Sequence, residues 1–326
     1  VVLPPPTSRR FQGWQYNCHP NDVQLPLQRL LRRQSCSMLS EDPPLKNAPA
    51  ACAEPVIRET ACKTILNRSG LEDYSLNCYT GCTHRCVYCY ARFMQRFHPH
   101  EEAWGDFVDV KVNAAETLKR QLRRARPGSV FVSSACDGWQ PIEAERRLTR
   151  RCCELLLERG FQLHVLTKSE LILRDFDVFQ SGAVRVGITL TTLDERLREL
   201  WEPGAAGVEQ RCRVIEEARR AGLETSVMFG PLLPFLSDSE AEIDALLRRA
   251  GDLGVGTIWV DALNPRPRVW HAVADLLRAE FPELLPRYQK ILFDRSSRAE
   301  YLGELRARID RAAQRASLSD RVGACM

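Results

Sequence analysis

The sequence predicts an α/β protein with a parallel β-sheet, and three observations support this. Short apolar runs alternate with amphipathic stretches from about residue 61 onward. The runs have the length of strands, whereas the stretches repeat their apolar residues at the three- and four-residue intervals of a helix. The chain has 326 residues, enough to bury a sizeable core. Strands that alternate with helices form a parallel sheet with right-handed crossovers.

The expected elements follow one another in βα order. Strands are expected at Tyr74–Cys78, Ser129–Ser134, Gln162–Thr167, Val184–Leu190, Glu224–Phe229 and Gly256–Val260. Helices are expected at Ala114–Arg124, Ala144–Arg159, Leu171–Phe179, Gly207–Ala221 and Ser239–Leu253. Six such units suit an incomplete (β/α) barrel as well as an open doubly wound sheet. No G-x-G-x-x-G follows the first strand, so the dinucleotide-binding version of the open sheet is unsupported.

The two ends of the chain differ from this central part. Residues 1–60 are rich in proline and are expected to form an N-terminal extension. Residues 61–266 form the predicted βα core. Residues 267–326 form a charged segment, helical from about 269 to 317, that is expected to pack on the outside.

Composition favours a cytoplasmic protein that binds a metal. No stretch approaches the roughly 18 apolar residues of a membrane span, and the first residues, VVLPPPTSRRF, lack the apolar core of a signal peptide. The 13 cysteines are an odd number in a long chain, which favours a reducing compartment with some cysteines bound to metal. The net charge of +4 permits contact with nucleic acid without arguing for it.

Three cysteines with metal-ligand spacing follow the first expected strand. Cys82, Cys86 and Cys89 form a C-x3-C-x2-C pattern in a loop that a barrel would place at its carboxyl-terminal mouth, where active sites lie. Three thiolates can each take one iron of a [4Fe–4S] cluster and leave the fourth iron open. An open iron suits S-adenosylmethionine (SAM), whose amino and carboxylate groups can chelate it. A zinc site completed by His84 or Cys78 is the alternative.

The stretch Ser75–Phe93 resembles the spore photoproduct lyase-like family of the radical SAM superfamily. The C-x3-C-x-Y-C-Y pattern is met by Cys82, Cys86, Tyr88, Cys89 and Tyr90. The resemblance spans roughly residues 60–305. It implies a partial (β/α)6 TIM-type barrel, with a [4Fe–4S] cluster and SAM at its mouth and an electron donor such as flavodoxin or ferredoxin.

Several site residues are implied by the resemblance. Tyr90 is similar to a tyrosine implicated in hydrogen-atom relay, and Tyr88 flanks the same cluster cysteine. Lys168 resembles a lysine that pairs with the SAM carboxylate. Asp137 resembles the aspartate of the lyase C-x-S-D segment, and Thr189 lies where a hydroxyl residue meets SAM.

The chain departs from the lyase pattern at the hydrogen donor. The lyase has cysteine where this chain has Ser134, and a cysteine stands two places later, at Cys136. A shift of two along a strand keeps the same face but moves the side chain by about 7 Å. Cys136 is therefore a candidate donor with a different geometry, and repair of thymine dimers is in doubt.

Other features leave further possibilities open. Cys62, Cys78 and Cys136 are candidate ligands of an auxiliary iron–sulfur cluster, with Cys52 not far upstream. Unliganded cysteines otherwise behave as small buried hydrophobes. The basic runs at Lys119–Arg126 and Arg146–Arg151 could contact phosphates, but such runs are more often the solvated face of a helix.

The sequence thus predicts an enzyme that cleaves SAM reductively at a [4Fe–4S] cluster. The 5′-deoxyadenosyl radical would then abstract hydrogen from a substrate that the residues do not identify. Nucleic acid, in repair or modification, is the class implied by the resemblance, and a metabolite or peptide is also open. One alternative is a nucleic-acid-binding protein with a structural metal cluster. The other is a sulfur-inserting enzyme with an auxiliary cluster.

Overall fold

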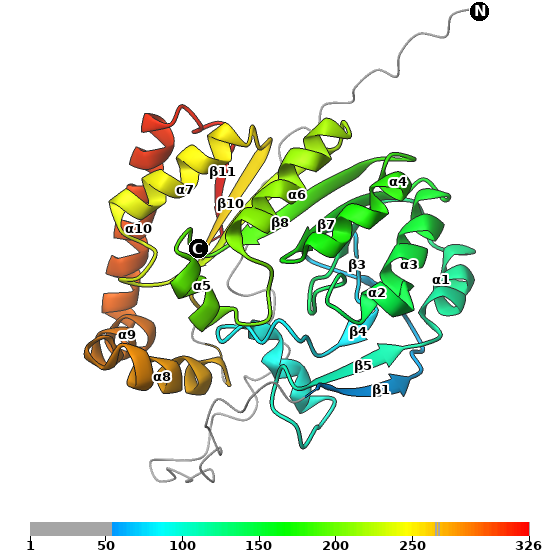
Figure 1. Ribbon diagram of the computed structural model, residues 1–326, viewed down its shortest axis with the longest axis horizontal. Coiled ribbons are helices and arrows are strands. Elements are labelled where there is room, and N and C mark those ends of the chain that lie inside the picture. The colour runs from blue at the N-terminus through cyan, green and yellow to red at the C-terminus, as the bar shows by residue number, and fades with distance from the viewer. Residues whose placement is uncertain (1–53, 265, 267, 326) are drawn as a thin grey trace, which may run out of the picture.

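The computed structural model describes residues 54–264, 266 and 268–325 of the chain. Its main sheet has eight strands in the order β11-β10-β9-β8-β7-β6-β3-β2, and only the β2–β3 pair is antiparallel. The parallel strands β3 and β6 to β10 follow one another in chain order, as successive right-handed βα units require. The sheet curves into a partial barrel with helices on its outside (Figure 1).

The bounds of the elements are as follows. The strands are β1 (Val56–Thr60), β2 (Leu66–Arg68), β3 (Tyr74–Leu76), β4 (Tyr79–Thr80), β5 (Phe107–Lys111), β6 (Ser129–Val132), β7 (Gln162–Thr167), β8 (Val184–Leu190), β9 (Glu224–Leu232), β10 (Thr257–Ala262) and β11 (Val322–Cys325). The α-helices are α1 (Ala114–Leu122), α2 (Glu143–Arg146), α3 (Leu148–Leu157), α4 (Phe176–Phe179), α5 (Glu195–Trp201), α6 (Val208–Arg220), α7 (Glu240–Asp252), α8 (Val269–Glu280), α9 (Leu285–Phe293) and α10 (Arg295–Arg315). Short 3-10 helices cover Tyr90–Arg96, Glu170–Asp175 and Pro282–Leu284.

The concave face of the sheet is identified by a contact across one strand. His164 of β7 and Ser226 of β9 approach to 3.4 Å, although β8 lies between their strands. They meet over Gly187, where an added Cβ would lie 2.7 Å from the serine hydroxyl. Because side chains alternate along a strand, Thr189 lies on this same inner face, nearer the carboxyl end of β8. Lys168, one residue beyond β7, comes four residues after His164, so the same alternation places it on the inner face.

One expected helix is broken in two. The stretch Ala144–Arg159 was predicted as a single helix, but Arg147 adopts φ +50° and separates α2 from α3. The break has a local cause, because the Glu143 carboxylate turns back and accepts the first backbone N–H groups of α3, at 3.0–3.2 Å. That carboxylate therefore supplies the cap that the helix N-terminus needs.

Some strands lie outside the expected set. β1 falls inside the predicted extension 1–60 and pairs in parallel with β5, and β4 completes their three-stranded sheet. Residues 1–53 of that extension lie outside the described residues. The expected helical tail is confirmed in α8 to α10, and it is followed by β11, which pairs in parallel with β10. None of the helices in the described part of the chain is long and apolar enough to cross a membrane.

Candidate active site

The cysteine triplet lies in the loop that follows β4. Two tight turns link its members, since Arg85 N donates to Cys82 O and Cys89 N donates to Cys86 O, at 3.3 and 3.2 Å. Cys82 and Cys86 are buried, and Cys89 is half-buried. Burial raises the pKa of all three thiols, that of Cys86 to about 12. A metal that binds here must therefore displace their protons.

The donor set fits a cluster better than a single ion. Within the ranges that the structure describes, no three His, Cys, Asp or Glu side chains converge as the ligands of one ion do. A zinc site completed by His84 or Cys78 needs such convergence. The ligands of a cubane can lie farther apart, because each thiolate takes a different iron atom. Three cysteines on one loop, two buried and one half-buried, therefore suit an iron–sulfur cluster.

Asp137 ties the end of β7 to the cysteine loop. Its carboxylate accepts hydrogen bonds from the Thr167 hydroxyl and the Lys168 backbone N–H, both at 2.8 Å, and lies 3.3 Å from His84 Nδ1. It also accepts the backbone N–H of Trp139 at 2.9 Å. These contacts fix the backbone on which Lys168 stands, so the visible role of Asp137 is to position its neighbours.

The ammonium group of Lys168 has no anionic partner in direct contact. It forms no hydrogen bond or ion pair with any described residue, and it lies 5.8 Å from the centroid of the Tyr88 ring. Burial alone would lower the pKa of Lys168, but the charges of Cys86 and Glu202 outweigh burial and raise it. A half-buried cation without a partner beside the cysteine loop suits an anionic ligand such as a carboxylate.

Glu202 and Arg211 form a buried ion pair next to this cation, and the sequence did not single out either residue. Their side chains are at most 1% exposed, and Arg211 Nη2 lies 2.5 Å from Glu202 Oε2. The Tyr88 hydroxyl donates to Glu202 and lies 3.0 Å from the Thr191 hydroxyl. The phenol of Tyr88, a predicted catalytic group, is therefore engaged in this network.

The segment after α5 forms a wall of the cysteine loop. Val87 N donates to Trp201 O and Gly204 N donates to His84 O, at 2.9 and 3.0 Å. A side chain at Gly204 would begin 2.1 Å from Thr83 O, so only glycine permits this approach. This wall places Glu202 beside Tyr88.

The predicted catalytic residues Tyr90 and Cys136 differ in their surroundings. The Tyr90 ring is 43% exposed and stacks on Phe93 at 6.3 Å. The Arg266 guanidinium lies 5.7 Å from the Tyr90 ring centroid. The Cys136 thiol is buried and donates to Tyr79 O at 3.3 Å, and burial raises its pKa to about 12. Tyr90 is thus open to a ligand, whereas Cys136 is directed at the backbone.

The cysteines proposed for an auxiliary cluster have other neighbours. The Cys78 thiol is buried 3.7 Å from the Cys152 sulfur of α3. The backbone of Cys62 exchanges hydrogen bonds with the Asn113 side chain. No auxiliary cluster is shown among the described residues, and Cys52 lies outside them.

Arginines of the second basic run are engaged in ion pairs on the protein itself. Arg146 lies 2.7 Å from Glu59, and Arg150 lies 2.7 Å from Asp177. These pairs agree with the solvated-face interpretation of the run.

Asp261 of β10 is a carboxyl group without a side-chain partner among the described residues. It accepts only the backbone N–H of Ala262, at 2.9 Å, and burial raises its pKa to about 6. A raised pKa means that the neutral acid favours the folded state. The stability that protonated Asp261 contributes is fully present below the pKa of its carboxyl group in the unfolded chain, near 4. It is lost as pH rises through about 6.

Asp261→Asn is therefore expected to stabilise the protein relative to wild type as pH rises from 4.5 to 7.5. The gain in unfolding free energy should be on the order of 2 kcal/mol. Urea unfolding at the two pH values measures it, with the exposed Asp310→Asn as the control. Parallel pH profiles for Asp261→Asn and wild type would contradict the assignment.

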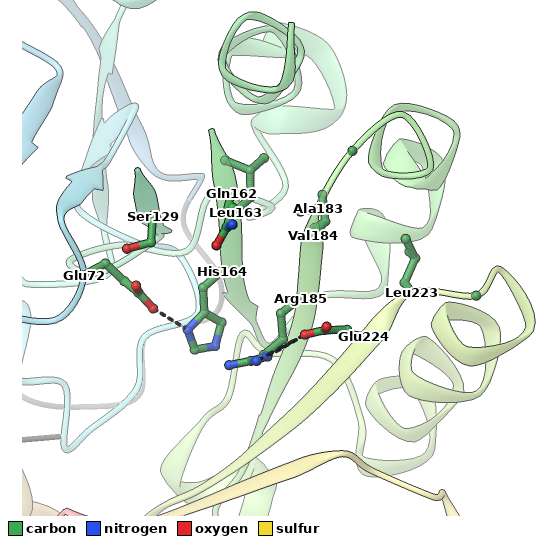
Figure 2. Close-up of a pocket in the computed structure, with 12 residues that line it drawn as sticks. Glu72, Ser129, Gln162, Leu163, His164, Ala183, Val184, Arg185, Leu223 and Glu224 are labelled. Atoms are coloured by element: carbon green, nitrogen blue, oxygen red, sulfur yellow. Dashed lines mark hydrogen bonds and ion pairs between the residues drawn. The ribbon is translucent and has the colours of Figure 1, made fainter. Parts of the chain in front are cut away.

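A cavity of about 140 Å³ lies at the opposite end of the sheet, at the amino ends of β6 to β9. Figure 2 shows its polar wall, in which Glu72 pairs with His164 and Arg185 pairs with Glu224. The lysine and the cysteine loop stand at the carboxyl ends of the strands, so this cavity is separate from them.

Comparison with known proteins points to one superfamily. A family model for the radical SAM superfamily matches residues 76–247. The uncharacterized protein Rv2578c of Mycobacterium tuberculosis is 33% identical over 249 residues, 72% of each chain. The uncharacterized protein MJ0683 of Methanocaldococcus jannaschii is 33% identical over 168 residues, 51% of this chain. The chain spans 63% of MJ0683, less than two thirds of that relative's length.

A solved structure shares the fold. Spore photoproduct lyase complexed with dinucleoside spore photoproduct superposes with a TM-score of 0.61, covering 83% of this chain and 82% of the lyase chain. The two sequences are 13% identical, so this likeness concerns the fold alone.

Proposed function

The chain belongs to the radical SAM superfamily, and we propose that Cys82, Cys86 and Cys89 hold its [4Fe–4S] cluster. The family implies this cluster and SAM as cofactors. The assignment to these cysteines rests on their spacing, their burial and their place at the barrel mouth. When bound, the cluster supplies the electron that cleaves SAM reductively, so that hydrogen can be abstracted from a substrate.

Lys168 is proposed to bind the carboxylate of SAM. The observation that carries the proposal is its position, because Lys168 lies beside Cys86 and its charge meets no carboxylate at ion-pair distance within the described residues. Asp137 holds the Lys168 backbone through its N–H and so sets where the ammonium stands. Thr189 lies on the same inner face, one strand away, and is proposed to line the SAM site.

We propose nucleic acid as the substrate class. Phe93 stacks on Tyr90 and meets Phe97 edge-on, with ring centroids 6.3 Å apart in both pairs, and Phe97 is 65% exposed. Arg266 lies over the Tyr90 ring, and Arg96 is exposed on the same 3-10 helix. Aromatic rings interleaved with arginines suit the stacking of single-stranded bases. The bound dinucleoside of the structurally similar lyase agrees with this class.

Formation of 5′-deoxyadenosine tests the proposed function. The protein would be reconstituted anaerobically with iron and sulfide, then given dithionite and SAM. We expect SAM cleavage, and we expect faster cleavage with a single-stranded oligonucleotide than with a peptide of similar length. An intact cluster with no 5′-deoxyadenosine would refute the activity. Equal rates with both additions would refute only the substrate class.

Lys168→Met is expected to weaken SAM binding without loss of the cluster. Removing a charge-assisted contact costs about 1.5–3 kcal/mol, or roughly 10- to 100-fold in the dissociation constant. Equilibrium dialysis of the reconstituted protein with SAM measures it. The exposed Lys290→Met of α9 is the matched control. An unchanged affinity for SAM in Lys168→Met would show that Lys168 does not bind SAM.

The two alternatives predict different iron contents and different responses to SAM. A sulfur-inserting enzyme with an auxiliary cluster would bind about seven or eight iron atoms per chain, against about four for one cubane. A structural cluster would have no open iron. The separate surroundings of Cys62 and Cys78 favour a single cluster.

A further inference from the structure

Asp261 lies on the inner face of the barrel, close to the carboxyl end of β10. Met228 of β9 comes two residues after Ser226, so its side chain lies on the same inner face. A Cβ added at Gly230 would lie 3.3 Å from the Asp261 Cβ and 3.3 Å from the Met228 side chain. The Asp261 side chain therefore leaves the sheet on the inner face, at the mouth of the barrel.

A β-bulge in the sheet lies beside Asp261. Beyond the pair Val260–Phe229 and before the next pair along the strands, β9 has two residues and β10 has only Asp261. β-Bulges are common next to active sites, where they redirect a side chain. Gly230 is one of the two β9 residues opposite, and its lack of a side chain leaves space beside the Asp261 carboxyl group.

The half-buried carboxyl group of Asp261 can accept more hydrogen bonds than the described residues donate to it. Its Oδ1 accepts the backbone N–H of Ala262 at 2.9 Å, and no other hydrogen bond or ion pair to the group is formed within the described ranges. The charges of Arg266 and Arg298 act on the group, but both guanidinium groups are engaged elsewhere. The first lies over the Tyr90 ring, and the second donates to a backbone carbonyl at 2.8 Å. Such an acceptor suits a ligand that donates hydrogen bonds.

Asp261 belongs to a different side of the mouth from the residues proposed to bind SAM. Lys168 follows β7 and Thr189 belongs to β8, whereas β9 lies between β8 and the strand of Asp261. The loop after β10 carries Arg266 to the Tyr90 ring, 5.7 Å from its centroid. The aromatic rings proposed to stack bases are thus joined to the barrel mouth on the side of Asp261.

We propose that Asp261 binds the Watson–Crick edge of a guanine base in the substrate and so determines base specificity. The inference rests on the proposed function and deepens it. Single-stranded bases are commonly recognised on this edge. Guanine presents two adjacent N–H donors there, which match the two acceptor oxygens of a carboxylate. Adenine and cytosine present one donor beside an acceptor nitrogen, which a carboxylate repels, and thymine presents one donor between two carbonyl oxygens.

The test is the binding of labelled oligonucleotides to the reconstituted full chain, measured by fluorescence anisotropy at pH 7.5. At this pH the Asp261 carboxyl group is mainly ionised, because burial raises its pKa only to about 6. Each probe is a short oligothymidylate, or the matching oligouridylate, with a single guanine, adenine or cytosine at its centre. The guanine probe is expected to bind about 10- to 100-fold more tightly than the other two. Comparison of the DNA and RNA probes identifies the source of the base, since guanine has the same edge in both.

Asp261→Asn replaces one acceptor oxygen with an amide donor and is expected to lose most of the preference for guanine. The exposed Asp310→Asn of α10 is the matched control and should keep it. Equal affinities of wild-type protein for the three probes would overturn the inference. An undiminished preference for guanine in Asp261→Asn would overturn it as well.

A second measurement needs no variant to fold. Hypoxanthine keeps the ring N–H of guanine but lacks its amino group, so wild-type protein is expected to bind a hypoxanthine probe about 10-fold or more weakly than the guanine probe. Equal binding of the two probes would overturn the inference. Failure of the proposed function looks different, because no probe would then bind or no 5′-deoxyadenosine would form, and the guanine site would be refuted with it. Tight binding without base preference refutes only the role of Asp261.

Discussion

Cys86→Ala is expected to abolish 5′-deoxyadenosine formation, down to the background of a mixture without protein. The substitution removes one of three proposed iron ligands, and two thiolates on a loop cannot hold a cubane that needs all its protein ligands. The fold should survive, because the change deletes a single buried sulfur, and most single substitutions cost 0.5–3 kcal/mol. Iron content and product formation after anaerobic reconstitution measure the effect.

Cys153→Ala is the matched control for this experiment. Its thiol is as well buried as that of Cys86, but it lies in α3, away from the cysteine loop. The control should keep about four iron atoms per chain and wild-type cleavage of SAM. If Cys86→Ala retained both properties, the assignment of the cluster to this loop would be wrong.

Arg211→Met is expected to lower the free energy of unfolding by about 3–5 kcal/mol. Burial would raise the pKa of Glu202, but Arg211 and Lys168 outweigh it and keep that carboxylate ionised. Without Arg211 a buried carboxylate is left with its charge poorly compensated. Urea unfolding at neutral pH measures the loss.

The double variant Arg211→Met with Glu202→Gln separates the charge effect from packing. Both groups of the pair are then uncharged, so much of the lost stability should return. A single variant as stable as wild type would contradict the role of the pair. A double variant no more stable than Arg211→Met would show that packing dominates.

The order of the barrel strands could be predicted because each strand is apolar and precedes an amphipathic helix. The expected strands 162–167 and 184–190 agree with β7 and β8 residue for residue. β1 could not be predicted in this way, because its burial pattern is mostly exposed and it pairs at an edge with β5. The break at Arg147 depends on the Glu143 carboxylate, and helical periodicity does not reveal such a cap.

The candidate site likewise contains residues that the sequence predicts and residues that only the fold reveals. The three cysteines proposed as cluster ligands lie within eight residues, so their spacing can be recognised in the sequence. Glu202 bonds with Tyr88, which lies 114 residues away, and it is one of 42 acidic residues. One feature of the sequence could have pointed to Arg211, because this residue lies on the apolar face of α6 between Val208 and Ile215. A charge on a buried helix face needs a partner, and only the fold shows which one.

The most direct test of the central claim is the electron paramagnetic resonance (EPR) spectrum of the dithionite-reduced, reconstituted protein with and without SAM. An open iron at the cysteine loop, with Lys168 beside it, predicts a [4Fe–4S] signal whose g-values shift when SAM is added. The same shift should be weaker in Lys168→Met at limiting SAM. A cluster signal that SAM leaves unchanged at saturating concentration would mean that all four irons are already coordinated, and would contradict the account.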